Sequence, residues 1–189
     1  MKHMLVAGVV GQGGLHTAVG SISCGYTYVG LHRLVAWGDL LRARSGCVVD
    51  GRLLRDASPQ TRHALTARAV SRGYRQPHAI SHLSALAVHG LPLLNITADA
   101  VHLTLTGPGF PRTLNGLRVH PRLPDSAALT RDGSRVVHAA IAIVQSAALA
   151  GVAAGVAAAD AALYSGQVTK DDLEIALRIA RLGPGRGDA

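Results

Sequence analysis

The residues most able to do chemistry gather in the stretch AISHLSALAVHGLPLL, which spans positions 79–94. Its histidines, His82 and His89, lie on a predicted helix that begins after Ser81 and ends at Gly90, because serine is a favoured N-cap and glycine a favoured C-cap. Seven positions, or about two helical turns, separate the two rings, which is too far for one metal ion to join them. The pattern therefore predicts a structural motif in which both histidines form hydrogen bonds at the helix ends.

The other histidines provide no pattern typical of a metal site. His78 stands four positions before His82, but the predicted cap at Ser81 places it outside the helix. His102 and His120 fall on the polar faces of two predicted strands, and no HExxH motif occurs. We therefore expect no bound metal ion.

Patterns typical of catalysis are also missing from the sequence. Of the 11 acidic residues only Glu174 is a glutamate, and the aspartates show no spaced pair suited to acid–base or two-metal chemistry. Ser81 lies beside a histidine but lacks the GxSxG elbow of an activated nucleophile. We expect no catalytic residue and no cofactor, and hence no enzyme.

Positive charge concentrates between Leu31 and Arg75. The chain of 189 residues has a net charge of +8, and this segment holds nine arginines and three aspartates, so it contributes nine minus three, or +6. Clustered cations attract nucleic acid, because each neutralised phosphate releases counterions. A solvated basic surface in a chain that prefers arginine to lysine explains the same charge. The arginines are Arg33, Arg42, Arg44, Arg52, Arg55, Arg62, Arg68, Arg72 and Arg75.

Two apolar stretches superficially resemble export or membrane segments. Residues 1–30 begin MKHMLVAGVV, but repeated glycines interrupt the apolar run, so we expect no signal peptide. Residues 139–159 are alanine-rich, and alanine and glycine supply little transfer free energy, so we predict a buried helix pair that breaks near Gly151. We therefore expect no membrane contact. The cysteines Cys24 and Cys47 show no paired spacing, which favours a reduced, cytoplasmic setting.

Local patterns predict both helices and strands. The Ser45-Gly46 pair joins two strands, and Ser58 with Pro59 begins a helix that ends near Gly73. Alternation at 101–106 predicts a half-buried strand. Further strands are expected at 116–122 and in RDGSRVVH, ending at His138, and a last helix is expected after its cap, Thr169.

The order of these motifs resembles the actinobacterial AbiEi-like antitoxin family over roughly residues 33–182. The members of that family are described as predicted transcriptional regulators of viral defence in type IV toxin–antitoxin systems. The motifs that carry the resemblance are WGDLLRARSGCVVDG, SPQTRHALTARAV, ISHLSALAVHGLP, VHLTLT, GLRVHPRLP, DGSRVVHAA, GVAAADAAL and VTKDDLEIAL.

The resemblance implies a winged-helix DNA-binding segment followed by an α/β antitoxin domain. Such a protein represses its own operon and opposes a nucleotidyltransferase-like toxin without a stable complex. Arg42 and Arg44 then lie on the wing hairpin, with Arg33 on the approach to it, and Arg52 and Arg55 complete the expected DNA-binding set.

The expected class is thus α+β, with a degenerate winged-helix-like part and then a small mixed α/β domain of three or more strands and C-terminal helices. The expected segments are a divergent stretch at 1–30, a basic winged-helix-like segment at 31–75, an antitoxin-like domain at 76–183 and a flexible tail at 184–189.

Three departures from the family pattern leave an alternative open. Residues 1–30 show no helix-turn-helix periodicity, which suggests a degenerate recognition helix or a wrong start. Gln145 replaces a usual aspartate, and the chain ends where longer relatives continue into an endonuclease-like domain. The alternative to a DNA-binding regulator is a truncated protein-interaction module that does not bind DNA.

Overall fold

The protein divides into two compact units, Met1–Arg75 and Gln76–Ala189, and each is described by itself. Both contain helices and strands, which confirms the predicted α+β class. The expectations for the Ser45-Gly46 turn, for the tail at 184–189 and for most of residues 1–30 fall outside the described residues. The computed structural model describes residues 15–17, 27–44, 47–94 and 99–181.

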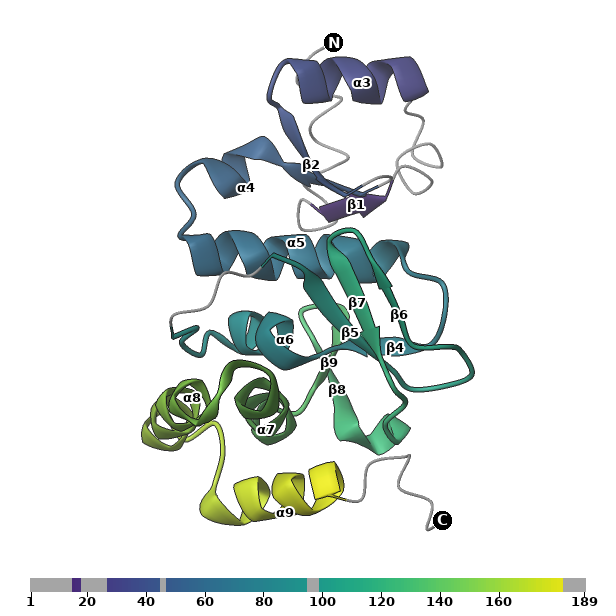
Figure 1. Ribbon diagram of the computed structural model, residues 1–189. Coiled ribbons are helices and arrows are strands. Elements are labelled where there is room, and N and C mark those ends of the chain that lie inside the picture. The colour runs from purple at the N-terminus through teal and green to yellow at the C-terminus, as the bar shows by residue number, and fades with distance from the viewer. Residues whose placement is uncertain (1–14, 18–26, 45–46, 95–98, 182–189) are drawn as a thin grey trace. The chain divides into compact units, whose positions relative to one another are not determined.

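The N-terminal unit is built on an antiparallel sheet in the order β1-β3-β2 (Figure 1). Strands β2 and β3 pair as the sequence predicts, and helix α3 comes directly before them. The elements are β1 (Leu15–Thr17), α3 (Tyr28–Ala36), β2 (Leu40–Arg44), β3 (Cys47–Asp50), α4 (Gly51–Arg55) and α5 (Pro59–Gly73).

The middle strand β3 is buried on both faces, because helices cover the sheet from both sides. Val48 packs in one apolar cluster with Leu31 and Leu34 of α3. Its neighbour Val49 packs in a second cluster with Ala69 of α5. Adjacent strand residues point to opposite faces, so α3 and α5 lie on opposite sides of the sheet, as Figure 1 shows.

Helix α3 begins earlier than the sequence analysis assumed. Thr27 is its N-cap, and the Thr27 hydroxyl accepts a hydrogen bond from the Gly30 N–H at 3.0 Å. The segment boundary expected between residues 30 and 31 therefore falls inside a helix. The helix predicted after Ser58 is confirmed, with the Ser58 hydroxyl accepting from the Thr61 N–H.

The C-terminal unit contains a six-stranded mixed sheet in the order β6-β7-β5-β4-β9-β8. Its strands are β4 (His78–Ile80), β5 (Val101–Leu105), β6 (Arg112–Leu114), β7 (Leu117–His120), β8 (Ala128–Arg131) and β9 (Ser134–Val137). Its helices are α6 (His82–His89), α7 (Ala139–Ala150), α8 (Val152–Tyr164) and α9 (Lys170–Arg181), with a short 3-10 turn, η1, at Asp125–Ala127.

Strand β5 corrects the prediction of a half-buried strand. It pairs with β4 on one side and β7 on the other, and all five of its residues are buried. His102 and Thr104, expected on a polar face, are 4% and 1% exposed. The prediction fails because alternation describes one strand alone, whereas the rings of His82 and His120 cover His102 in the folded unit.

Helix α6 forms the centre of the layer beside this sheet. It packs against β5, β9 and α7, and α7 in turn packs against α8 and α9 (Figure 1). The predicted break of the alanine-rich stretch is confirmed, because Gly151, with φ of +94°, separates α7 from α8. Among the described residues, no helix combines the length and the apolar character that a membrane crossing requires.

Candidate functional site

The exposed face of α3 and the strand after it carry the first candidate site. Leu31 and Leu34 are buried on the side of the helix that packs against the sheet, whereas His32 and Arg33 are exposed on the other side. Helical spacing places further exposed side chains beside them. These are Tyr28, Val29, Ala36 and, just after the helix, Trp37.

The adjacent strand β2 adds a second exposed arginine. Helix α3 packs against β2, and Arg42 is exposed on this edge strand, opposite Val48 of β3. Within the described residues no ion pair engages Arg33 or Arg42. Arg44 ends β2, and its side chain lies outside the described part of the chain.

Gly51, directly after β3, makes a close backbone contact with the turn that follows α3. The Gly51 N–H donates to the Asp39 carbonyl at 2.8 Å, which ties the end of β3 to the turn after α3. A Cβ at Gly51 would overlap the Gly38 carbonyl oxygen, so the two backbone segments approach as only glycine permits. The orientation of the hairpin relative to α3 is therefore fixed by backbone contact.

The remaining predicted DNA-binding arginines, Arg52 and Arg55, lie on the short helix α4 and not on α3 or β2. Arg52 forms an ion pair with the buried Asp50, through Nη2 to Oδ2 at 2.8 Å and Nε to Oδ1 at 3.2 Å. Burial raises the pKa of Asp50, but hydrogen bonds from the Arg52 side chain and backbone outweigh it and hold that pKa below its ordinary value. Arg52 thus stabilises the start of α4, while Arg55 is exposed at its end.

The predicted structural motif around α6 is partly confirmed. Gly90 ends the helix in the left-handed conformation with φ of +76°, and the His89 Nε2 atom lies 2.8 Å from the Val137 carbonyl oxygen, tying the helix end to β9. Burial lowers the pKa of His89, so the ring is neutral and donates Nε2–H to that carbonyl. Ser81 occupies the N-cap position, but its side chain makes no capping hydrogen bond, which corrects that expectation.

His82 lies at the start of α6, with its Nδ1 atom 3.0 Å from the Ser81 hydroxyl, and its ring also belongs to a cluster that the sequence did not predict. Its ring stacks on that of His120 at a centroid distance of 3.7 Å and lies 5.5 Å from that of His102. His102 Nδ1 and His120 Nε2 are 2.9 Å apart. One ring nitrogen of each histidine lies within 4.8 Å of those of the other two. We call these three residues the histidine triad.

The sheet topology brings the triad together. Parallel pairing places His120 opposite Thr104, so His102 and His120 are diagonal neighbours on one face. The Ser81 N–H donates to the His102 carbonyl at 3.0 Å, and this contact brings the start of α6 over β5. Histidines 18 and 20 positions apart in sequence thereby converge from α6, β5 and β7.

The backbone around the triad is held by long-range hydrogen bonds. His82 has φ of +50°, which is uncommon for a residue with a side chain, and its N–H donates to Gln145 Oε1 of α7 at 3.2 Å. The His102 N–H donates to the Ser84 hydroxyl at 2.9 Å. Gln145, noted in the sequence only as a departure from the family pattern, therefore positions His82.

Their surroundings keep the rings of His82 and His120 uncharged. Burial, followed by repulsion from His120 and His102, lowers the pKa of His82 to about 2. Burial, followed by the nearby Arg118 guanidinium, lowers the pKa of His120 to about 4. Neutral imidazoles present nitrogen lone pairs, so the cluster can accept hydrogen bonds or bind a metal ion.

This cluster was not predicted from the sequence, because its histidines come from a helix and two strands and no spacing along the chain connects them. The signal that was present is the placement of His102 and His120 on the polar sides of two strands. Strand order alone decides whether such side chains meet, and strand order could not be read from the sequence.

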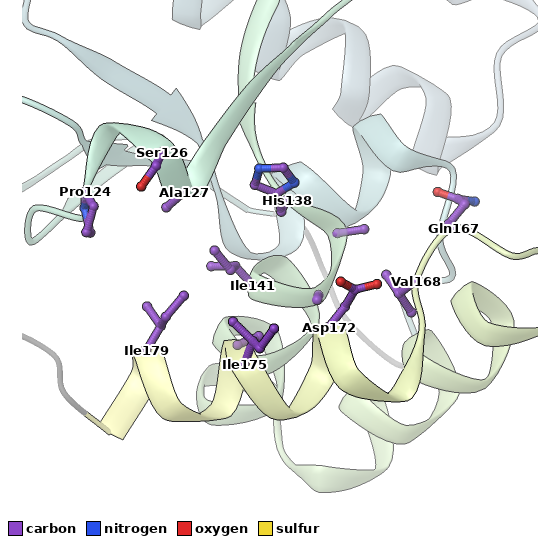
Figure 2. A pocket seen from close by; sticks show the side chains of 13 residues that line it. Pro124, Ser126, Ala127, His138, Ile141, Gln167, Val168, Asp172, Ile175 and Ile179 are labelled. Carbon is purple, nitrogen blue, oxygen red and sulfur yellow. The ribbon is translucent and has the colours of Figure 1, made fainter.

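A cavity of about 330 Å³ in the C-terminal unit offers little chemistry of its own. Figure 2 shows Ile141, Ile175 and Ile179 gathered along it, with Asp172 and His138 nearby. The Asp172 carboxylate accepts hydrogen bonds from the Thr169 N–H and hydroxyl, so it serves as part of the predicted cap of α9. The rest of the lining is mainly apolar.

Comparison with known proteins adds no assignment to these sites. No protein-family model matches the chain, and a search of curated proteins finds no significant similarity.

Proposed function

We propose that the protein is a DNA-binding transcriptional regulator that contacts DNA through α3 and the β2–β3 hairpin. The observation that carries this proposal is the exposure of Arg33 and Arg42 on neighbouring elements, each without a carboxylate partner among the described residues. A helix followed directly by a two-stranded hairpin is the order of recognition helix and wing in winged-helix proteins. Guanidinium groups on such elements reach phosphates and groove edges.

The proposal separates the arginines that the sequence grouped together. Arg33, Arg42 and Arg44 belong to α3 and β2 and act on DNA, with Arg55 at the margin. Arg52 acts through its ion pair with Asp50 and keeps α4 in place. The surplus of positive charge in residues 31–75 attracts DNA at long range, because the field of many charges sums.

The resemblance to the antitoxin family extends the proposal to the protein's cellular role. The regulator represses its own operon and opposes a nucleotidyltransferase-like toxin. Coexpression tests this extension: we expect the chain to relieve the growth arrest caused by a nucleotidyltransferase-like toxin expressed in the same cell. Failure of rescue with DNA binding intact removes the antitoxin role and leaves the regulator.

The direct test measures binding of the full chain to its own promoter fragment by fluorescence anisotropy at several salt concentrations. We expect log Kd to rise linearly with log salt, with a slope of about 0.9 for each neutralised phosphate. A random fragment of equal length should bind more weakly. Absent binding, or binding insensitive to salt, overturns the proposal.

Exposed apolar side chains favour a second candidate function, that of a protein-interaction module. Tyr28, Val29 and Trp37 are 64%, 62% and 60% exposed on or just after α3. Aromatic side chains of this kind are enriched in protein interfaces. Self-association or partner capture that is lost in Trp37→Ala, together with absent DNA binding, would select this candidate.

A further inference from the structure

We propose that His82, His102 and His120 form a binding site for a divalent transition metal ion of the zinc class. The proposal goes beyond DNA binding and does not depend on it, because the triad belongs entirely to the C-terminal unit. It assigns a role to side chains that the proposed regulator function does not use.

The distances within the triad are close to those of a metal site. Zinc binds histidine nitrogen at about 2.0–2.1 Å in tetrahedral geometry, which places two ligand nitrogens about 3.3 Å apart. The ligand atoms of the triad lie within 4.8 Å of one another, and His102 Nδ1 is 2.9 Å from His120 Nε2. Shifts of about 1.5 Å or less therefore bring all three into the range that zinc requires.

The side chains must turn for binding, and the backbone can remain where it is. The stacked rings of His82 and His120 direct their nitrogens side by side, so rotation about the side-chain torsions is needed for the lone pairs to converge. The backbone N–H groups of His82 and His102 are held by Gln145 and Ser84. Fixed backbones limit the conformational entropy that is lost when the metal binds.

Surrounding groups orient one ring and leave a path for the ion. His82 Nδ1 lies 3.0 Å from the Ser81 hydroxyl, which leaves His82 Nε2 as the ligand atom. A hydrogen bond to the non-ligating nitrogen is the usual companion of a metal-binding histidine. His82 and His120 are half-buried, so the site is accessible from solvent.

The ligand set selects the chemical class of the ion. Three neutral imidazoles favour zinc and its neighbours cobalt, nickel and copper over magnesium or calcium, which prefer oxygen. Arg118 is the nearby charge that opposes a cation, and it is exposed, so water screens it. Three protein ligands leave a fourth position open to water.

The first experiment measures metal binding by the full chain after EDTA treatment and removal of the chelator. Zinc is titrated in competition with a chromophoric chelator, and cobalt binding is followed by its visible spectrum. We expect one ion per chain, a Kd of about 1 μM or below, a tetrahedral cobalt spectrum and a raised melting temperature with zinc. Absence of stoichiometric binding overturns the proposal.

Variants then show which histidines bind the ion. His82→Gln and His120→Asn should each weaken zinc binding by more than about 100-fold, because they remove a direct ligand. His138→Ala is the matched control, since His138 is exposed in the same unit and lies outside the triad. Unchanged binding in both triad variants, or binding lost only in the control, overturns the proposal.

A measurement on the unsubstituted chain covers the case in which a variant fails to fold. Histidine ring nitrogens are observed by NMR before and after zinc is added. Perturbation of the His82, His102 and His120 rings by one equivalent supports the site. Perturbation of other histidines alone overturns it.

Discussion

Arg33 and Arg42 of the N-terminal unit and the histidine triad of the C-terminal unit place polar groups in opposite surroundings. The arginines are exposed and charged, and they act through a field that reaches well beyond contact distance. The triad rings are buried or half-buried and close together, and those of His82 and His120 are uncharged, so the triad acts through lone pairs at short range. Variants of the first group should therefore change salt-dependent binding, whereas variants of the second should change metal binding and leave DNA binding intact.

The largest expected effect comes from removing the two exposed arginines together. If Arg33 and Arg42 each neutralise one phosphate, Arg33→Ala with Arg42→Ala weakens promoter binding about 200-fold at 50 mM salt and about 30-fold at 150 mM. The salt slope falls by about 1.8 for the same reason. Anisotropy titrations at both salt concentrations check this expectation.

A matched double variant controls for total charge. Arg122→Ala with Arg131→Ala removes two exposed arginines from the C-terminal unit and should leave affinity within about threefold of wild type, because no DNA contact is assigned to these side chains and salt screens exposed charges. Equal weakening by both double variants would mean that binding follows net charge and would remove the assignment to α3 and β2.

A buried histidine outside the triad gives the next largest effect, on stability alone. His89 is 4% exposed, and His89→Ala leaves the Val137 carbonyl without its donor and opens a cavity, which lowers the free energy of unfolding by about 2–4 kcal/mol. Urea titration measures the change. His138→Ala, at an exposed position, should change stability little. A His89→Ala variant as stable as wild type would contradict the structural role of this ring.

Substitution of Arg52 should have a smaller effect, on stability. It distinguishes an arginine that stabilises the N-terminal unit through an ion pair from the arginines that are proposed to contact DNA. Arg52→Ala leaves the buried Asp50 carboxylate without its ion-pair partner, so we expect lower stability of this unit than in Arg55→Ala. Promoter affinity should stay within about threefold of wild type, because Arg52 is already paired. Strong loss of DNA binding in the folded Arg52→Ala protein would return this residue to the DNA-contacting set.

The two regions also differ in how much of their structure could be predicted from the sequence. The antiparallel pairing of β2 with β3, the cap of α5 and the break at Gly151 join residues that are close in sequence, so local patterns predict them. The triad depends on the order of β4, β5 and β7, and so does the complete burial of His102. Such contacts are set by tertiary packing, which alternation within one strand does not encode.

The smallest expected effect is a pH dependence carried by one buried histidine in each unit. Burial lowers the pKa of both His63 and His89 in the folded protein. The unfolded chain therefore binds protons more readily, so their contribution to stability is full above their ordinary pKa of 6.5 and is lost as the pH falls below it. Arg131 and His138 face His89 and lower its pKa further, whereas for His63 burial is the cause.

Urea titrations between pH 7 and pH 5 separate the two contributions. Wild-type stability should decrease toward pH 5, and His63→Gln and His89→Gln should each show a shallower decrease, because glutamine does not titrate in this range. The comparison uses the difference between each variant and wild type, which cancels the titration of all other groups. A slope unchanged in His89→Gln would mean that the His89 ring titrates alike in the folded and unfolded chains, so that its burial does not oppose protonation.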